Sequence, residues 1–276
     1  MSSTDFTATP GIEQFLQVLA TGERSFVCNT FQPNLNRAIF GGQTLGLAQA
    51  AADRTVAEGF WPHMLQMNFV AAGRIDTPIE MDVEFIQESR RFASRLVRLS
   101  QAGRLIATAS VSYHRGEKGF DHAADAPVAP PPEDLRCLRT LGADFHDELN
   151  ELSRRVVAYH GAGAEIRPVD PESLLLRTTE TPHLRYWIRN QCPTPPAPRE
   201  QYALLAYLSD SWFGMTVLLP HRPHKFNDDM FLSSLNHTVW YHTHDLHTDD
   251  WLLVDAESPA ACHGRGLTLG RVYDRN

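Results

Sequence analysis

Alternating apolar and polar residues mark a long stretch in the first half of the chain. Residues 79–88 read IEMDVEFIQE, and residues 92–101 (FASRLVRLSQ) and 104–114 (RLIATASVSYH) keep the same two-residue period. This alternation is typical of half-buried β-strands. Ala102-Gly103, between the last two stretches, predicts a hairpin turn. We therefore expect three consecutive strands here.

Helical patterns precede these strands. Residues 11–20 carry apolar side chains at helical spacing. Residues 42–57 are rich in alanine and leucine, and such small side chains let a helix pack closely against other backbone. Further strands are predicted at 24–31 and 63–71. The first half of the chain thus forms one unit of strand, helix and four strands.

The same order of elements returns in the second half. The pattern predicts a strand over 173–189, then a helix from about Arg199 to Leu218 that Pro220 stops. Three strands follow, at about 231–243, 250–260 and 265–274. Because internal repeats govern the fold of a chain, we predict two related units.

The predicted boundaries are an N-terminal unit at residues 1–118, a linker region at 119–170 and a C-terminal unit at 171–276. Within the linker region, residues 121–135 contain three consecutive prolines and are predicted not to pack a core. Residues 139–160 favour a helix.

The second unit is predicted to lack its last strand. Its counterpart of the strand at 104–114 would follow residues 265–274, where the sequence reaches the turn-forming residues of Asp274-Arg275-Asn276. The two units are therefore expected to differ by one strand.

Charge and composition narrow the class of protein. The 276 residues include 25 basic and 33 acidic ones, for a net charge of -8. This balance argues against a nucleic-acid partner, because phosphate binding requires a basic footprint. The four cysteines form no CxxC pair, so neither a zinc ribbon nor a disulfide scaffold is expected. Neither a signal peptide nor a membrane-spanning run is evident, which predicts a cytoplasmic protein with no membrane partner.

The last third of the chain carries the candidate chemistry. Asp210 follows the apolar run LLAYLS, and an acid among apolar neighbours is a candidate general base. Ser234, on the next predicted strand, is its candidate hydroxyl partner. Gly42 and Gln43 stand at a predicted helix N-terminus, where unpaired N–H groups can hold a carbonyl oxygen or a phosphate. Tight helix packing explains the glycine equally well.

Several sequence blocks together carry a resemblance to a known family. They are RAIFGGQ at residues 37–43, LLAYLSD at 204–210, SLNHTVWYH at 234–242, DDWLL at 249–253, Glu257-Ser258 and Arg265-Gly266. In this order they resemble the type II acyl-CoA thioesterases (TesB-like), and the resemblance covers nearly the whole chain, from about residue 12 to 276.

The resemblance implies a fold and an activity. The fold is α+β, a double hotdog of two antiparallel sheets, each wrapped around a central helix. The activity is hydrolysis of an acyl-CoA thioester to a carboxylic acid and CoA, without a cofactor. The partner is an acyl-CoA substrate, and the assembly is a homodimer or homotetramer.

The resemblance also implies site residues. An Asp, a Thr or Ser, and a Gln orient the attacking water in the family. Asp210 matches the first and Ser234 the second. The Gln belongs to the last strand of the second hotdog, for which this sequence offers no residue. A catalytically weak or inactive acyl-CoA-binding protein on the same fold is therefore the alternative.

Other interpretations rest on histidines and arginines. His242, His244 and His247 suggest a metal site, but no carboxylate triad accompanies them, and none is predicted. His237 lies on the opposite strand face from Ser234 and is interpreted as structural.

Two further chemistries have weaker support. Arg90, Arg91 and Arg95 can contact CoA phosphates, although a solvated hairpin end is the commoner role of such a cluster. Hydratase chemistry, which hotdog folds also host, requires an Asp–His pair that the sequence does not reveal. No GxSxG elbow occurs, which favours water over a serine nucleophile.

Overall fold

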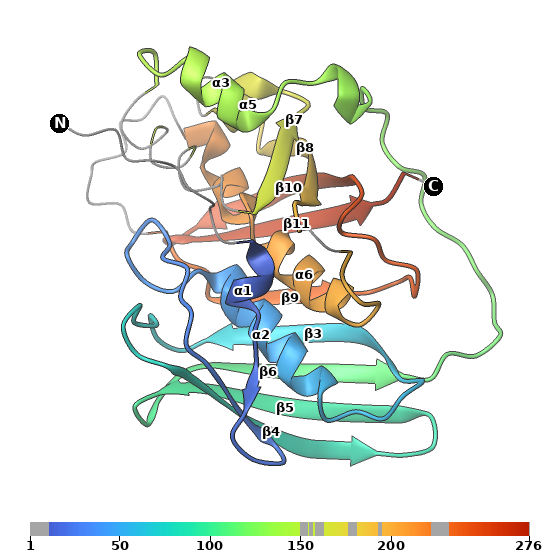
Figure 1. Cartoon of the computed structure of the whole chain (residues 1–276). Coiled ribbons are helices and arrows are strands. Elements are labelled where there is room, and N and C mark those ends of the chain that lie inside the picture. Colours follow the sequence, from blue (N-terminus) through green and yellow to red (C-terminus); the bar gives the residue numbers. More distant parts are fainter. Residues whose placement is uncertain are drawn as a thin grey trace.

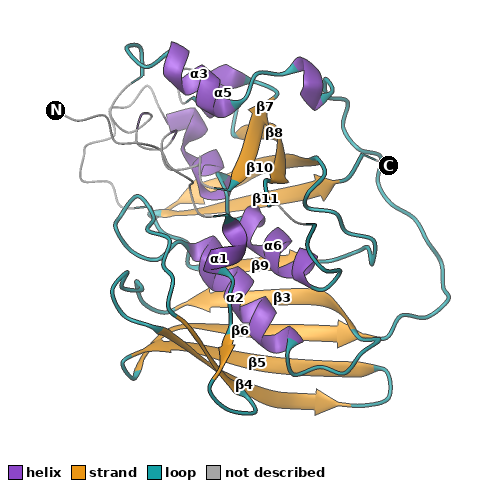
Figure 2. Cartoon of the chain, viewed as in Figure 1, coloured by secondary structure: helices purple, strands orange, loops and turns teal. Residues whose placement is uncertain are grey.

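A computed structural model gives the fold in two sheets with helices between them (Figure 1). It describes residues 11–149, 154, 157, 163–175, 181–192, 195–221 and 232–275. Figure 2 shows the division into helices, strands and connecting loops.

The first sheet has seven strands in the order β1-β2-β4-β5-β6-β3-β9. The predictions for 79–88, 92–101 and 104–114 are confirmed to the residue. The Ala102-Gly103 hairpin is also confirmed, with both residues in the left-handed region at φ 48° and 77°. The strands are β1 Leu19–Ala20, β2 Ser25–Cys28, β3 Trp61–Phe69, β4 Ile79–Glu88, β5 Phe92–Gln101, β6 Arg104–His114 and β9 Asn236–Trp240.

The second sheet has four strands in the order β11-β10-β8-β7, and every neighbouring pair is antiparallel. Its first strand, β7, lies within the segment predicted as a linker. The predicted strand at 173–189 is wrong in its first part, where a short helix forms, and residues 176–180 lie outside the described residues. The strands are β7 Ala164–Pro168, β8 His183–Asn190, β10 Leu252–Cys262 and β11 Arg265–Tyr273.

Strand β9 joins the first sheet rather than the second, contrary to its predicted place. It pairs antiparallel with β3, from Met64 opposite Trp240 to Asn68 opposite Asn236. In the first sheet β6 fills the position between β5 and β3. Within the described residues, no strand fills the corresponding position between β11 and β9. The only described strand that pairs with β9 is therefore β3.

The helices are shorter than the sequence pattern predicted. The segment at 11–20 yields one turn of helix, and the prediction over 139–160 is confirmed only for its first part, with turns following to Leu149 and most of the rest outside the described residues. The helices are α1 Ile12–Phe15, α2 Gly41–Asp53, α3 Leu138–Asp144, α5 Pro171–Leu174 and α6 Glu200–Ser209, with 3-10 helices η1 Pro132–Asp134 and η2 Phe213–His221.

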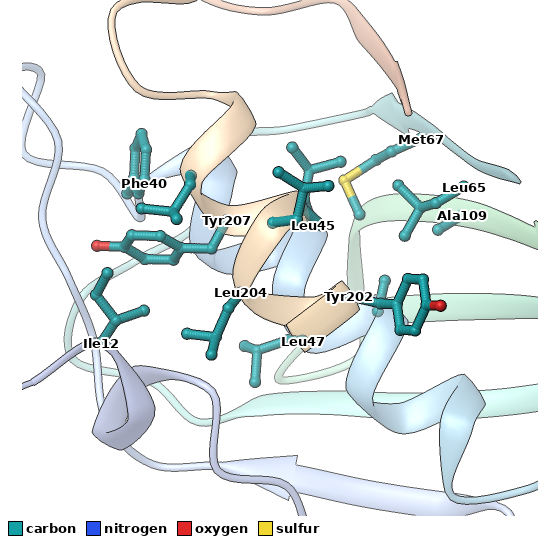
Figure 3. Packing of buried hydrophobic residues seen from close by; sticks show 14 of the residues in the cluster. Ile12, Phe40, Leu45, Leu47, Leu65, Met67, Ala109, Tyr202, Leu204 and Tyr207 are labelled. Carbon is teal, nitrogen blue, oxygen red and sulfur yellow. The ribbon is translucent and has the colours of Figure 1, made fainter. Parts of the chain in front are cut away.

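Helices α2 and α6 form an antiparallel pair at the centre of the molecule (Figures 1 and 3). Two glycines of α2 set their distance. A Cβ on Gly42 would lie 2.5 Å from the carbonyl oxygen of Tyr207, and one on Gly46 would lie 2.9 Å from that of Ala203. Since real Cβ atoms do not approach so closely, only glycine permits this backbone contact. The prediction of close helix packing is confirmed.

The core surrounds this pair. Figure 3 shows Leu45 and Leu47 of α2 together with Leu204 and Tyr207 of α6. All four are buried, and the inward residues of β3 and β6 belong to the same cluster. Helix α2 also contacts β4, β5 and β6, whereas α6 contacts β8. Burial of this many apolar side chains supplies the main driving force for folding.

The proline-rich segment 121–135 packs partly against the second sheet, although it was predicted not to pack a core. Ala129 and Leu135 lie against a second cluster made of Trp187, Trp251 and Leu253, on the face of the second sheet opposite α6. The indole Nε1 of Trp187 donates to the carbonyl oxygen of Pro130 at 2.9 Å. The linker thus covers aromatic side chains of the second sheet.

The long helix predicted from Arg199 to Leu218 breaks in the middle. Asp210 is the C-cap of α6, and Trp212 follows with a left-handed φ of 64° before η2 begins. A bulky residue rarely adopts this conformation, and it ends the helix sharply. The segment Glu200–His221 has the length and composition of a membrane span, but 72% of its apolar window is buried inside the protein. The apolar side chains of this segment therefore belong mostly to the protein core.

Candidate active site

Asp210 lies where the C-terminus of α6 meets the N-terminus of α2. Its side chain is only 10% exposed. One carboxylate oxygen, Oδ2, lies 2.6 Å from the position that a Cβ on Gly41 would occupy. The carboxylate therefore fills the space left by the missing side chain of Gly41, the first residue of α2.

The N-terminus of α2 offers free donors at this point. The amides of Gln43 and Thr44 bond to the carbonyl oxygen of Phe40. The amides of Gly41 and Gly42 have no acceptor within the helix, as at every helix start. Asp210 lies beside the first of these donors, and such an arrangement can hold a carbonyl oxygen and a water side by side.

His237 is the second ionisable group beside Asp210. Its Nδ1 lies 3.6 Å from Oδ1 of Asp210, and its Nε2 lies 3.0 Å from the hydroxyl of Ser209. The ring is buried and also lies against Phe213, with ring centroids 5.5 Å apart. An Asp–His pair is thus present, although the sequence did not reveal it.

The alternation of side chains along β9 explains why His237 lies beside Asp210. Val239 and Tyr241 point into the core from the same strand and the residue after it. The two-residue period places His237 on that same inner face. This alternation is the signal that locates His237 near the helix ends.

Ser234 lies outside the strand on which it was predicted. It precedes β9 by two residues and is half-buried. Within the described residues, its hydroxyl makes no hydrogen bond to Asp210. The assignment of Ser234 as the hydroxyl partner therefore stays a prediction.

Gly42 and Gln43 have different surroundings. Gly42 packs against the carbonyl of Tyr207, as described above. Gln43 is fully buried, and its side-chain amide is occupied by backbone: Nε2 donates to the carbonyls of Phe15 and Thr30, and Oε1 accepts from the amide of Gln32. The side chain of Gln43 thus supports the loop before α2, and any substrate contact at this helix end falls to backbone amides.

The break at Trp212 limits the helical neighbours of Asp210. Phe213, Gly214 and Val217, which one continuous helix would bring near its face, belong to η2 instead. Two buried tyrosines are close instead. Burial, with a further contribution from the charge of Asp210, raises the pKa of Tyr186 well above its ordinary value. Burial likewise raises the pKa of Tyr207, so both phenols remain protonated donors.

The arginine cluster is mostly structural. Arg95 is fully buried, with its guanidinium bound to Glu88 and to the hydroxyl and carbonyl of Thr55. Arg91 pairs with Glu117. Arg95 is therefore not accessible to a phosphate.

The three histidines that suggest a metal site in the sequence, His242, His244 and His247, lie in the loop after β9. His244 stacks on Trp61 with ring centroids 5.4 Å apart, and His247 bonds to Asp245 at 3.0 Å on the surface. Among the described residues, no group of three or more His, Cys, Asp or Glu is arranged to hold a metal ion.

Comparisons with known proteins identify the family of this chain. A family model for the acyl-CoA thioesterase N-terminal domain matches residues 32–114, and one for the C-terminal domain matches residues 125–276. The chain is 32% identical to acyl-coenzyme A thioesterase 8 of Homo sapiens over 86% of this chain and 76% of that protein. It is 29% identical to acyl-CoA thioesterase 2 of Haemophilus influenzae, over 87% of this chain and 83% of that protein.

Solved structures show the same fold. The acyl-CoA thioesterase II TesB2 of Mycobacterium marinum superposes with a TM-score of 0.76 at 26% identity, covering 96% of this chain and 92% of that one. A hotdog-fold protein of Alicyclobacillus acidocaldarius also reaches 0.76, at 18% identity and with 95% and 91% covered. The predicted hotdog class is thus confirmed, and the chain belongs to the acyl-CoA thioesterase family, a family of thioester hydrolases.

Proposed function

We propose that this protein hydrolyses acyl-CoA thioesters with a water activated by Asp210. One observation carries the proposal: the Asp210 carboxylate is held, largely buried, against the first residue of α2, whose first amides have no acceptor within the helix. A base and an oxyanion site are therefore adjacent. The thiolate of CoA is a good leaving group, so the reaction has little need for a strong acid.

The reaction follows from these positions. The thioester oxygen accepts from the amides of Gly41 and Gly42, and the dipole of α2 favours the negative charge that develops on it. Asp210 accepts a proton from water as the water oxygen bonds to the thioester carbon. The carbon–sulfur bond then breaks, and the proton passes to the departing thiolate. Ser234, in the segment leading into β9, is proposed to orient the water.

We also infer finer features of the architecture. Each sheet is proposed to wrap one helix, α2 in the first unit and α6 in the second, as the hotdog class implies. The contacts of α2 with β4, β5 and β6 support this arrangement. The domain boundaries, the cytoplasmic location and the homodimeric or homotetrameric state remain predictions.

Free thiol release from acyl-CoAs of several chain lengths tests the activity. Asp210→Asn is expected to reduce kcat by roughly a hundred- to ten-thousand-fold, the usual contribution of a general base. Asp245→Asn, which changes an exposed acid, is the matched control. No thiol release from any acyl-CoA would overturn the hydrolase proposal, and undiminished release by Asp210→Asn would overturn the base.

Binding without turnover is the second candidate. The absence of a Ser234–Asp210 hydrogen bond within the described residues favours it. Calorimetric titration with a non-hydrolysable acyl-CoA thioether distinguishes the two. Tight binding with no thiol release would identify a binding protein.

A further inference from the structure

The contacts of His237 point to a role beyond packing. This residue is the second of β9, and its ring is buried at the junction of three elements. Asp210 and Ser209 contact it from the end of α6, and Phe213 contacts it from η2. Each ring nitrogen of His237 has a defined neighbour, so these neighbours indicate which nitrogen carries a hydrogen.

The hydroxyl of Ser209 fixes one ring nitrogen. Its oxygen lies 2.8 Å from the carbonyl oxygen of Ala206, which can only accept. The single hydroxyl hydrogen is therefore used there. The 3.0 Å contact with Nε2 of His237 then requires the hydroxyl oxygen to accept, so Nε2 carries a hydrogen.

The other nitrogen faces the carboxylate. In neutral histidine with a hydrogen on Nε2, Nδ1 carries a lone pair. At 3.6 Å it would face the lone pairs of Oδ1 of Asp210. Two acceptors in a buried contact are unfavourable without a proton between them. The distance is just beyond a hydrogen bond, and such bonds often tighten only when substrate binds.

We propose that His237 is a positioning residue that directs an N–H at Nδ1 toward Oδ1 of Asp210, fixing the orientation of that carboxylate and presenting Oδ2 to the attacking water. Oδ2 is the oxygen that lies over Gly41 at the start of α2. The two carboxylate oxygens thus have separate tasks. This inference rests on the proposed role of Asp210 as the base.

Two substitutions of His237 test the roles of its two ring nitrogens separately. The amide nitrogen of asparagine can take the place of Nδ1, whereas that of glutamine can take the place of Nε2. His237→Asn therefore keeps a donor toward Asp210 and loses the contact with Ser209. His237→Gln keeps the Ser209 contact and loses the donor toward Asp210.

The experiment is steady-state thiol release by both variants. His237→Gln is expected to lower kcat roughly ten- to a hundredfold with KM unchanged, because the base is misplaced while no group that binds the substrate is altered. His237→Asn is expected to recover most of the lost kcat. His247→Gln, which breaks an exposed His–Asp pair, is the matched control and should match the parent protein.

Several outcomes overturn the inference. Equal losses in the glutamine and asparagine variants, or a loss expressed in KM, would make His237 a packing residue. Thermal melting by circular dichroism shows whether either variant is unfolded, and the two are compared at matched folded fractions. An inactive Asp210→Asn beside a fully active His237→Gln would overturn this inference alone, whereas an active Asp210→Asn would overturn the proposed function beneath it.

Discussion

The two ends of the α2–α6 pair each hold an aspartate, and the two carboxylates differ in their partners. At one end, Asp53 accepts hydrogen bonds from the hydroxyl of Tyr113 at 2.7 Å and from the amide of Gln49 at 2.8 Å. At the other end, Asp210 contacts the backbone of Gly41 and one histidine at 3.6 Å.

The difference in partners distinguishes a structural aspartate, Asp53, from a candidate reactive one, Asp210. The network at Asp53 extends through Gln49 to Tyr241 and consists of packed side chains that satisfy each other. Such a network rigidifies a fold. The carboxylate of Asp210 retains capacity for a new partner beside free helix amides. We infer that the same helix pair builds a supporting site at one end and a reactive site at the other.

Neutralising each acid in turn tests whether Asp210 and Asp53 have different roles. Asp210→Asn is expected to lose roughly a thousandfold in kcat while it melts near the parent protein. Asp53→Asn is expected to keep its thiol release. Kinetics and thermal melting of both variants give the result, and a large loss of kcat in Asp53→Asn would contradict the division of roles.

The support at the Asp53 end also depends on Arg199. Its guanidinium donates to the carbonyls of Asp53, Val56, Ala57 and Phe60, beyond the C-terminus of α2. Arg199→Met is expected to lower the free energy of unfolding by about 3 kcal/mol, because these carbonyls lose a charged donor. Urea denaturation measures the change. The folded fraction should keep its kcat, since Arg199 lies at the far end from Asp210.

A smaller change tests the space beside Asp210. Gly41→Ala would place a methyl carbon 2.6 Å from Oδ2 and displace the carboxylate without removing it. We expect roughly a tenfold loss of kcat, or about 1.4 kcal/mol. Gly214→Ala is the matched control, because its added carbon would meet its nearest neighbour at 3.8 Å. Equal kcat values in the two variants would show that the position of Oδ2 is not critical.

The smallest expected effect is a change in the free energy of unfolding with pH. Burial raises the pKa of Asp53 to about 7 from an ordinary value of 3.8, although hydrogen bonds from Tyr113 and Gln49 act in the opposite direction. Between these values the folded state binds a proton that the unfolded state has lost. The stabilisation is therefore complete below about pH 4 and is lost as the pH rises toward 7.

Asp53→Asn should remove this pH dependence. We expect the free energy of unfolding of the parent protein to fall by about 1 kcal/mol more than that of the variant between these pH values. This value is smaller than the full shift would give, because the side chain of Asp53 keeps some contact with solvent, which screens its charge. Urea denaturation at both pH values measures it. Parallel pH profiles would show that Asp53 is already ionised in the folded protein.

The first half of the chain was largely predictable. Residues 79–88, 92–101 and 104–114 alternate in period two, and Ala102-Gly103 supplies the left-handed turn between two of them. Strands β4, β5 and β6 are neighbours both in the sequence and in the sheet, so local patterns suffice to predict them. The start of α2 at Gly41 followed from its glycines and the small residues behind them.

The second half resisted prediction where contacts are distant in sequence. The break at Trp212 has no helix-breaking residue, and β9 pairs with β3 more than 160 residues away. The candidate acid was found because an aspartate after an apolar run stands out, and the resemblance supported it. His237 was missed as a partner because the irregular segment around Ser234 obscured the strand's inner face.

Local sequence patterns therefore predicted the strands β4, β5 and β6, the starts of α2 and α6, and the candidate acid at position 210, because each depends on residues close together in the chain. The groups that surround this acid follow from contacts between elements far apart in the sequence. The contacts of Asp210 with Gly41 and His237 arise from the antiparallel packing of α2 on α6 and from the pairing of β9 with β3. Packing of this kind is set by the whole core, since every buried side chain constrains its neighbours.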